Sequence, residues 1–416
     1  MSYTDISRQV YMRVTIQFPT PLVATKDDYL VDVYWTEETG SPSHYPYGSV
    51  TADRASITLY SPKGLFDPNN RASKYFGSIK RGLEISIEIK THSTDWLNLG
   101  TFYVQDWSYG SASGTASIDV VDKIQDKLKD SEPIPNILLD VGLKDACESL
   151  GIIAEDLVTF KSFSTDKSWS ETVDLICEAT RCFCTTDRQD NIVMRKPILS
   201  APYNIDDDTL LISIKNKSNL PTPSGDIVIE YGVPQVERNV PVLQLTNEEI
   251  IEGTNELGTF QTSVKHVLHY SVGNVSNVPS AKISYSGTAN NVNLVVESFS
   301  EGLADITIRA DVINYVIKQL GNTANNNNNT VYSNYLVQDE ISARYLQDMY
   351  SAFVNLEAPV LEIDTRGDPN LRVGDTVKLS SNKYNTNFEG IVIRHEYKYT
   401  GSLTCTTTLL HKEVVL

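Results

Sequence analysis

The chain has 416 residues, of which 40% are hydrophobic and 21% are charged, and its formal net charge is −18. This length predicts two to four domains, and the apolar content is sufficient for several cores. The acidic balance argues against a protein that wraps nucleic acid, because wrapping requires a surface rich in lysine and arginine. No apolar run reaches about 18 residues, so we expect no transmembrane helix.

The five cysteines are an odd number in a long chain, which gives no disulfide framework. The first residues, Met1 to Asp5, lack the basic segment and apolar stretch of a secretory signal. We therefore expect synthesis in a reducing cytoplasm.

The first 130 residues are rich in short strand-like runs. The clearest is residues 83–90, in which apolar residues alternate with Glu84, Ser86, Glu88 and Lys90. A period of two is typical of an antiparallel strand with one buried face. The other runs are rich in β-branched and aromatic residues, and they cover residues 11–16, 29–35, 56–60, 100–107 and 116–121. Their close spacing and the Gly, Pro and Ser turns between them predict a sandwich or a small barrel.

After the proline-rich break at residues 131–135, the spacing of the apolar residues changes from that of a strand to that of a helix. Apolar residues within 143–150 recur at helical spacing and predict a helix that ends at a glycine. Ser168 and Glu171 have the spacing of a capping box and predict the start of a second helix. Two strands within residues 181–195 are expected to form a β-hairpin.

Residues 200–232 return to a β pattern, with strands expected at 210–214 and 226–232. The Asn-, Ser- and Gly-rich stretch at 233–300 predicts more β structure, which we interpret as an insertion. Its candidate strands are residues 266–270, 282–285 and 293–297.

The apolar residues between Val312 and Leu320 suit a short helix closed by Gly321. Five consecutive asparagines at 325–329 predict a polar loop, since such a run cannot bury apolar surface. A longer helix is expected from an apolar stripe at fourfold spacing, which consists of Ile341, Tyr345, Met349 and Phe353. The last predicted strands are residues 360–363, 375–379, 390–394 and 404–410. Gly374 fits the tight turn that feeds the second of these.

Two stretches resemble phage tail hub (baseplate hub) proteins. Within residues 55–128, the segments ASITLYSPKGLFDP, YFGSIKRGLEISIEI, LGTFYVQDWS and ASIDVVDKIQDKL resemble the N-terminal domain of that family. Near the C-terminus, APVLEIDTRGDPNLRVGDTVKLSS and FEGIVIRHEYKYTGSLTCTTTLL resemble its closing barrel. The resemblance covers most of residues 1–232 and 331–416, whereas residues 233–330 depart from the family pattern.

The resemblance implies a mainly β protein with a smaller α+β part, in which two tube-like antiparallel β-barrels accompany a helix-hairpin middle domain and an inserted β-rich segment. With the sequence pattern it divides the chain into four domains. These are residues 1–130 (first barrel), 131–199 (α+β middle domain), 200–232 with 331–416 (second barrel) and 233–330 (inserted domain).

The function implied by the resemblance is that of a structural virion protein, the hub of a phage tail tip or baseplate. Three copies with two barrels each would continue the hexameric tail tube and adapt it to a threefold tip. The implied partners are two further copies of the chain, the tail tube or distal tail protein, tip, spike or receptor-binding proteins, and genomic DNA that passes without specific binding. The resemblance implies no enzymatic activity, no catalytic or metal-binding residue and no cofactor.

A hub would surround the channel through which DNA leaves. A duplex carries one negative charge per roughly 1.7 Å of its axis, so an acidic wall would let it slide. We expect Glu84 and Glu88, on the polar face of one strand, to face this channel.

Several polar or sulfur-containing groups could in principle carry chemistry. Cys182 and Cys184 lack a second pair at zinc-site spacing, and core packing is the favoured interpretation. His266 and His269 would point to opposite faces of a strand, which disfavours a shared ligand. The acidic run at 206–208 lacks the alternating ligands of a calcium loop and is interpreted as a solvated turn.

Asp364, Asp368 and Asp375 flank a predicted turn and are interpreted as loop polarity. The sequence contains no P-loop, nucleophile elbow, zinc-protease helix or dinucleotide fingerprint. Two alternatives to the hub stay open: a host-surface carbohydrate-binding tail protein, suggested by the Asn-, Ser- and Tyr-rich residues 233–300, and a tail-associated cell-wall hydrolase.

Overall fold

The computed structural model describes residues 8–39, 50–130, 136–155, 157–165, 167–216, 226–263, 266–278, 281–287, 291–321, 329–356 and 360–414. Within these ranges the chain is mainly β, as predicted, and its strands form five sheets, the largest with 13 strands. Among the helices in these ranges, none is long and apolar enough to cross a membrane. The predicted break at 131–135 and residues 325–328 of the predicted asparagine loop lie outside the described residues.

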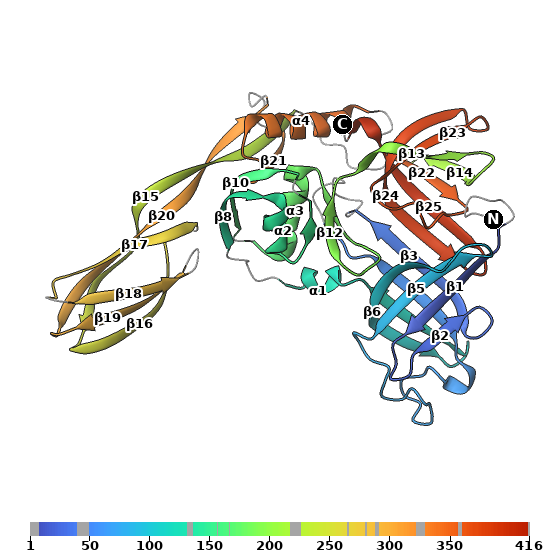
Figure 1. Ribbon diagram of the computed structural model, residues 1–416, viewed down its shortest axis with the longest axis horizontal. Helices are drawn as coiled ribbons and strands as arrows, with labels where there is room; N and C mark the ends of the chain where they lie inside the picture. Colours follow the sequence, from blue (N-terminus) through green and yellow to red (C-terminus); the bar gives the residue numbers. More distant parts are fainter. Residues whose placement is uncertain are drawn as a thin grey trace.

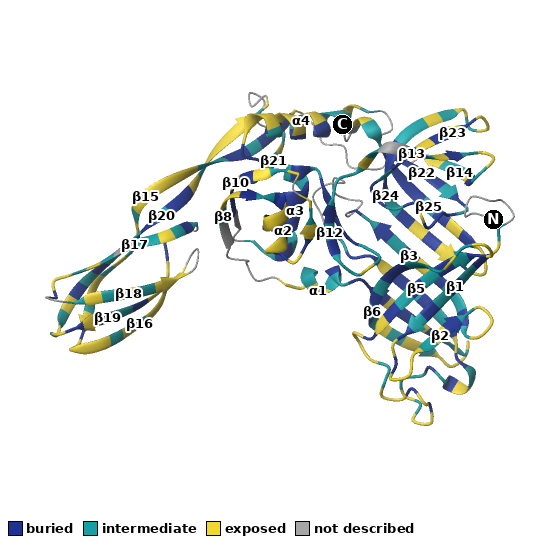
Figure 2. Cartoon of the chain, viewed as in Figure 1, coloured by how far each residue is buried: buried dark blue, intermediate teal, exposed yellow. Residues whose placement is uncertain are grey.

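The first part of the chain consists of the strands that its alternating pattern predicts. In β5 (Glu84–Thr91), the side chains of Ile85, Ile87 and Ile89 are buried, which confirms the predicted inner face. The other elements are β1 (Val10–Ile16), β2 (Leu22–Thr25), β3 (Leu30–Glu38), β4 (Arg54–Tyr60), the 3-10 turn η1 (Pro62–Gly64), β6 (Leu97–Gly110), β7 (Thr115–Val121) and α1 (Ile124–Leu128). Figure 2 shows the resulting alternation of buried and exposed residues along these strands.

The C-terminal part contributes a second group of strands. Its elements are β13 (Ile198–Asp206), β14 (Leu211–Asn216), β22 (Val360–Thr365), β23 (Asp375–Ser381), β24 (Thr386–Tyr399), β25 (Leu403–His411) and the 3-10 turn η2 (Lys412–Val414). Their buried side chains form a core of their own. Gly374, just before β23, has a φ of 88°, which confirms the predicted turn because this left-handed conformation suits glycine.

The two groups of strands share β24, which joins them into one sheet (Figure 1). The first half of β24 pairs with β23, and residues Arg394 to Tyr399 pair with Glu38 to Val33 of β3. The hydrogen-bonded order is β14-β22-β25-β24-β3-β4-β7-β6-β5-β1-β2, and in the described part it does not close on itself. The prediction of two closed barrels is therefore wrong on this point. A strand of 14 residues is long enough to pair with both groups.

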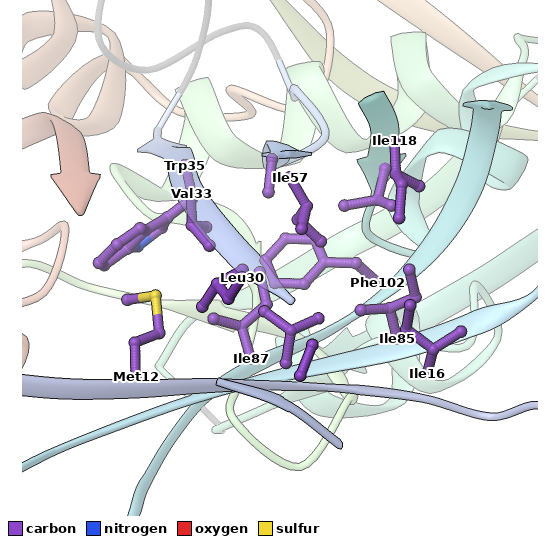
Figure 3. Packing of buried hydrophobic residues seen from close by; sticks show 14 of the residues in the cluster. Met12, Ile16, Leu30, Val33, Trp35, Ile57, Ile85, Ile87, Phe102 and Ile118 are labelled. Carbon is purple, nitrogen blue, oxygen red and sulfur yellow. The ribbon is translucent and has the colours of Figure 1, made fainter. Parts of the chain in front are cut away.

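The N-terminal strands curl around the first core without closing. In Figure 3 the side chains of Met12, Leu30 and Ile87 point into this core from different strands. From β24, Tyr397 stacks on Trp35 with ring centroids 4.3 Å apart. The hydroxyl of Tyr399 donates a hydrogen bond to the carbonyl of Val10 in β1, at 3.4 Å. The Tyr399 side chain thus connects β24 to β1, a strand with which β24 does not pair.

In the sequence, an α+β part separates the two groups of strands. Its elements are β8 (Asn136–Gly142), α2 (Leu143–Glu148), β9 (Ile153–Ala154), β10 (Thr159–Thr165), α3 (Trp169–Thr180), β11 (Phe183–Thr186) and β12 (Ile192–Arg195). The predicted capping box begins α3, because Ser168 and Glu171 exchange side-chain to backbone hydrogen bonds. The predicted hairpin is formed by β11 and β12. Cys182 and Cys184 are buried in this core, which confirms their packing role.

A long hairpin projects from the body as an arm (Figure 1). Its strands are β15 (Ile227–Ile250) and β20 (Gly302–Leu320), and its distal end carries β16 (Gly253–Gln261), β17 (Val267–Ser276), β18 (Lys282–Gly287) and β19 (Asn291–Ser298). The distal strands enclose a separate core. The helix predicted between Val312 and Leu320 is wrong, because these residues continue β20 and pair with β15.

The base of the arm is held by α4 (Glu340–Asn355) and by β21 (Thr330–Asn334), which pairs in parallel with β15. The predicted helix is confirmed, but its buried face is not the one predicted. Ile341 and Tyr345 are 69% and 53% exposed, whereas Met349 and Phe353 are buried. At 3.6 residues per turn, a stripe at fourfold spacing drifts by about 40° per step and leaves the buried face.

Candidate functional site at the meeting point of three cores

Charged side chains from the ends of several strands meet inside the body. Glu37 lies at the end of β3, and Asp53 and Asp122 lie just before β4 and just after β7. Thr186 ends β11, and Arg372 lies in the turn before β23. These strands belong to three different cores, so the cluster, here called the junction, forms where the three cores meet.

The alternation of β3 explains why a carboxylate is buried there. Val33, Trp35 and Glu37 occupy every second position, and all three face inward. A strand that buries its apolar face therefore also carries Glu37 into the interior. An isolated buried carboxylate is strongly disfavoured, so Glu37 requires a cation.

Arg372 supplies that cation and links the three parts. Its Nε lies 3.1 Å from an Oε of Glu37, and its guanidinium also donates to the carbonyl of Thr186, at 3.4 Å. Its backbone N–H donates to the carboxylate of Asp375, at 2.8 Å. The nearby Glu37 raises the pKa of Arg372, which keeps the guanidinium charged despite its burial. One side chain thus joins β3, β11 and the turn before β23.

Two further buried carboxyl groups extend the junction. The carboxyl of Asp122 accepts hydrogen bonds from the Thr186 hydroxyl at 2.9 Å and from the backbone N–H of Ile124 at 3.1 Å. That of Asp53 accepts from the backbone N–H of Glu38 at 3.1 Å. Burial raises the pKa of Asp122 to about 7. Burial, with the Asp122 and Glu37 charges, raises the pKa of Asp53 well above its ordinary value. Folding therefore shifts both groups toward their protonated forms.

His395 borders the junction, opposite Glu37 in the pairing of β24 with β3. Its Nδ1 lies 2.9 Å from the hydroxyl of Thr407. Burial, reinforced by the charge of Arg372, lowers the pKa of His395 to about 3. The ring is therefore neutral at physiological pH and acts as a packed polar group.

The tip of the β11–β12 hairpin is a second contact between the parts. The Tyr103 hydroxyl donates to Asp190 at 2.9 Å, and Lys123 forms an ion pair with the same carboxylate at 3.4 Å. Asn98 donates to the carbonyl of Arg188 at 2.8 Å, and the Arg188 guanidinium donates to the carbonyl of Pro369. The hairpin thus fastens the N-terminal strands to the C-terminal part. The sequence predicted the hairpin but not these contacts.

The predicted channel residues lie outside the junction, on the outer face of β5. Glu84 is exposed, and its backbone neighbour across the sheet is Tyr103. Glu88 is half-buried and forms a double hydrogen bond with the guanidinium of Arg13, at 2.6 and 2.7 Å. Lys90 and Arg13 both lie over the ring of Trp96. The charge of Glu88 is thus compensated, whereas Glu84 has no ion pair in the described part of the chain.

The predicted acidic turn has a structural role. The carboxylate of Asp207 accepts from Ser381 at 2.6 Å and from the backbone of Asn382 at 2.9 Å, and it thereby holds the turn after β23. Within the described residues, no group of three or more acidic, Cys or His side chains could hold a metal ion.

The interpretation of Asp364 and Asp368 as loop polarity needs correction. Asp364 lies within β22 and forms an ion pair with Lys215 at 2.8 Å. Asp368 is buried and accepts a hydrogen bond from the Tyr203 hydroxyl. Both fasten segments that lie far apart in the sequence, because Lys215 belongs to β14 and Tyr203 to β13.

No family model matches this chain, and no curated protein matches it. The solved 43 kDa tail protein of prophage MuSo2 from Shewanella oneidensis is similar in structure, with a TM-score of 0.53 and 10% identity over 97% of this chain and 100% of that one. The tail protein from Neisseria meningitidis MC58 has a TM-score of 0.54 and 8% identity over 98% of each chain. At such identities the likeness concerns the fold. The chain therefore has the fold of these tail proteins, which confirms at that level the resemblance visible in its sequence.

Proposed function

We propose that this chain is a structural virion protein that forms the hub of a phage tail tip or baseplate. The observation that carries the proposal is a shared fold over nearly the whole chain, 97% and 98% of it in two tail proteins. The junction supports the same role, because it fastens three cores into one body. A subunit that transmits force between the tail tube and the tip requires such fastening more than it requires a reactive group.

The hub would adapt a sixfold tube to a threefold tip. Two separate cores, one in the N-terminal strands and one in the C-terminal strands, give each subunit two curved units. Three subunits would then place six such units around the axis. Because β24 is common to both units, their mutual orientation is fixed within a subunit. The four-domain division of the chain stays a prediction.

The outer face of β5 is our candidate for the wall of the DNA channel. Of the two carboxylates predicted there, the exposed Glu84 has no cationic partner in the described part of the chain, while Glu88 is paired with Arg13. The acidity of this wall therefore depends on Glu84 rather than on both residues. DNA would pass such a wall without specific binding.

Electron microscopy of the purified full-length chain, alone and in assembled tails, tests the hub. We expect threefold particles with six similar units around an axial passage, located between the tube and the tip. A closed assembly without a passage, or a location away from the tail, would refute the proposal. The same preparation incubated with purified cell walls tests the hydrolase alternative, and we expect no release of wall fragments.

The carbohydrate-binding alternative gains little support from the arm. Tyr270 and Tyr285 pack beside the distal core, and the hydroxyl of Tyr270 donates to the carbonyl of Asn291 at 3.0 Å. Phe299 is exposed, but it lies in the turn between β19 and β20 rather than on a sheet face. A sugar site needs aromatic faces beside polar groups in a hollow, so the hub is the better-supported function.

A further inference from the structure

The distal end of the arm presents apolar side chains to solvent. Ile251, Phe299 and Leu303 are 58%, 73% and 57% exposed. They lie in or beside two neighbouring turns, one between β15 and β16 and one between β19 and β20. Backbone pairing holds these turns side by side, because Ile250 lies opposite Gly302 and Gly253 lies opposite Ser298. We call this surface the arm tip.

Hydrogen bonds fix both turns of the arm tip. The amide of Asn255 accepts from the backbone N–H of Ile251 at 3.0 Å and donates to the carbonyl of the same residue at 2.9 Å. In the second turn, the Ser298 hydroxyl donates to the carbonyl of Ser300 at 2.6 Å and accepts from its N–H at 3.2 Å. The backbone of both turns is therefore ordered before any partner arrives, which lowers the entropy cost of binding.

Carboxylates surround this apolar group. Glu249 lies opposite Leu303 in the β15–β20 pairing, Glu252 follows Ile251, and Glu301 lies between Phe299 and Leu303. All three glutamates are exposed, and none forms an ion pair within the described residues. Within 239–264 and 281–308 the sequence has one lysine or arginine, Lys282, which lies opposite Glu297 in the β18–β19 pairing. The arm tip is thus apolar at its centre and negative around it.

Asp305 differs from these glutamates. Its carboxylate accepts from the backbone N–H of Asn247 at 3.0 Å and from the side chain of Asn277 at 2.7 Å. It is engaged in holding the distal strands together. The charges available to a partner are therefore those of the glutamates.

We propose that the arm tip docks onto another protein of the same tail, at an apolar recess rimmed by lysine and arginine. This rests on the proposed tail function. The pattern is that of a protein interface, with an apolar centre that excludes water and a charged rim that guides the approach. An anionic membrane would repel the glutamates, and a second arm tip would repel them equally. A basic protein surface is the partner that complements both features.

The test measures binding of the full-length chain to each of the other structural proteins of the tail, purified singly. We expect one of them to bind with an affinity that falls as salt rises. Phe299→Ser should weaken this binding by about tenfold or more, mainly through faster dissociation. A triple variant, Glu249→Gln with Glu252→Gln and Glu301→Gln, should instead slow association and flatten the salt dependence. Val236→Ser and Glu237→Gln, exposed positions in the neck of the arm, are matched controls that should bind normally.

Several outcomes would overturn the proposal. Binding that the arm-tip variants leave unchanged, binding to none of the tail proteins, self-association through the tip, or binding to phosphatidylglycerol vesicles would each do so. Whether the chain is present in assembled tails distinguishes failure of the docking proposal from failure of the proposed function. If the chain is built into tails but the arm-tip variants behave like the parent chain, only the docking proposal falls; if the chain is absent from tails, both fall.

Discussion

Arg372 and Glu37 form a buried ion pair, 3.1 Å between Nε and Oε, across a separation of 335 positions in the chain. The pair connects β3, one of the N-terminal strands, with the turn before β23. Removing one member leaves the other as an uncompensated charge in the interior. For such pairs this costs about 3–5 kcal/mol, whereas replacing both by apolar groups is often neutral.

We therefore expect Arg372→Met to lower the melting temperature markedly and to weaken the contact between the N-terminal strands and the C-terminal part. The double variant Arg372→Met with Glu37→Leu should recover most of the loss. Calorimetric melting of the three proteins at one pH checks this. If the single variant melts like the parent chain, the junction contributes no stability and its role as a fastening is refuted.

The buried carboxyl groups predict how stability depends on pH. Burial raises the pKa of Asp122 from 3.8 to about 7, so folding favours its protonated form. That contribution is complete below about pH 4 and is lost as the pH rises through 7. Asp53 acts in the same direction, whereas His395, whose pKa burial lowers from 6.5 to about 3, opposes it below about pH 6.5. We expect the melting temperature to fall between pH 5 and pH 8.

Asp122→Asn should reduce this slope, because the amide mimics the neutral acid and can still bond to the Thr186 hydroxyl. The residual slope should come from Asp53 and from Asp174, whose pKa burial also raises to about 7. Melting curves at four pH values for both proteins make the comparison. An identical slope in the variant would show that Asp122 is ionised in the folded chain.

The inner and outer faces of β5 should respond differently to substitution. Ile85 is buried, so Ile85→Asp loses about 2–5 kcal/mol of packing and also places a charge in the core. We expect the N-terminal strands, residues 10–121, not to fold. Glu84→Ala, on the exposed face, should change stability by no more than about 0.5 kcal/mol. Circular dichroism and solubility of the two variants are the measurements, and equal behaviour would contradict the assigned faces.

Substitution of Gly374 should be costly for a steric reason as well as for its backbone conformation. A Cβ there would lie 2.2 Å from the ring of Phe183, and the φ of 88° is strained for any other residue. Gly77 has a similar φ of 78°, but a Cβ at that position would meet no atom within 4 Å, so Gly77 serves as the control. Gly77→Ala should cost about 1–2 kcal/mol, from backbone strain alone. Gly374→Ala should cost clearly more in denaturant unfolding, and an equal cost would show that the ring yields freely.

Much of the fold could be predicted because local patterns matched local structure. The alternation in β5 and the capping box of Ser168 and Glu171 needed no tertiary information. The helix prediction for Val312 to Leu320 was wrong, because the apolar residues of this segment recur at a spacing that also suits a helix. Their β-branched side chains favoured a strand, and pairing with β15 decided the outcome.

The junction could not be predicted from the sequence. Glu37 lies beyond the predicted strand at 29–35, and Arg372 resembles a solvated turn residue. The pairing of β24 with both β3 and β23 brings the two near each other. Electrostatic partners that depend on a long-range strand pairing leave no local signal, whereas the strand that carries Glu84 and Glu88 could be predicted from its own alternation. That these two residues line a channel stays a prediction.

The shared strand β24 also sets an order of events during synthesis. When β3 leaves the ribosome, β4 follows closely, but its other partner in the sheet is still more than 300 residues away, since Val33 pairs with Tyr399. Contacts over such separations form slowly, and until then β3 has a free side that other nascent chains can join. We expect C-terminally truncated chains that end before β24 to aggregate in the cell. Completion of the last strands would thus be the condition for a stably folded subunit.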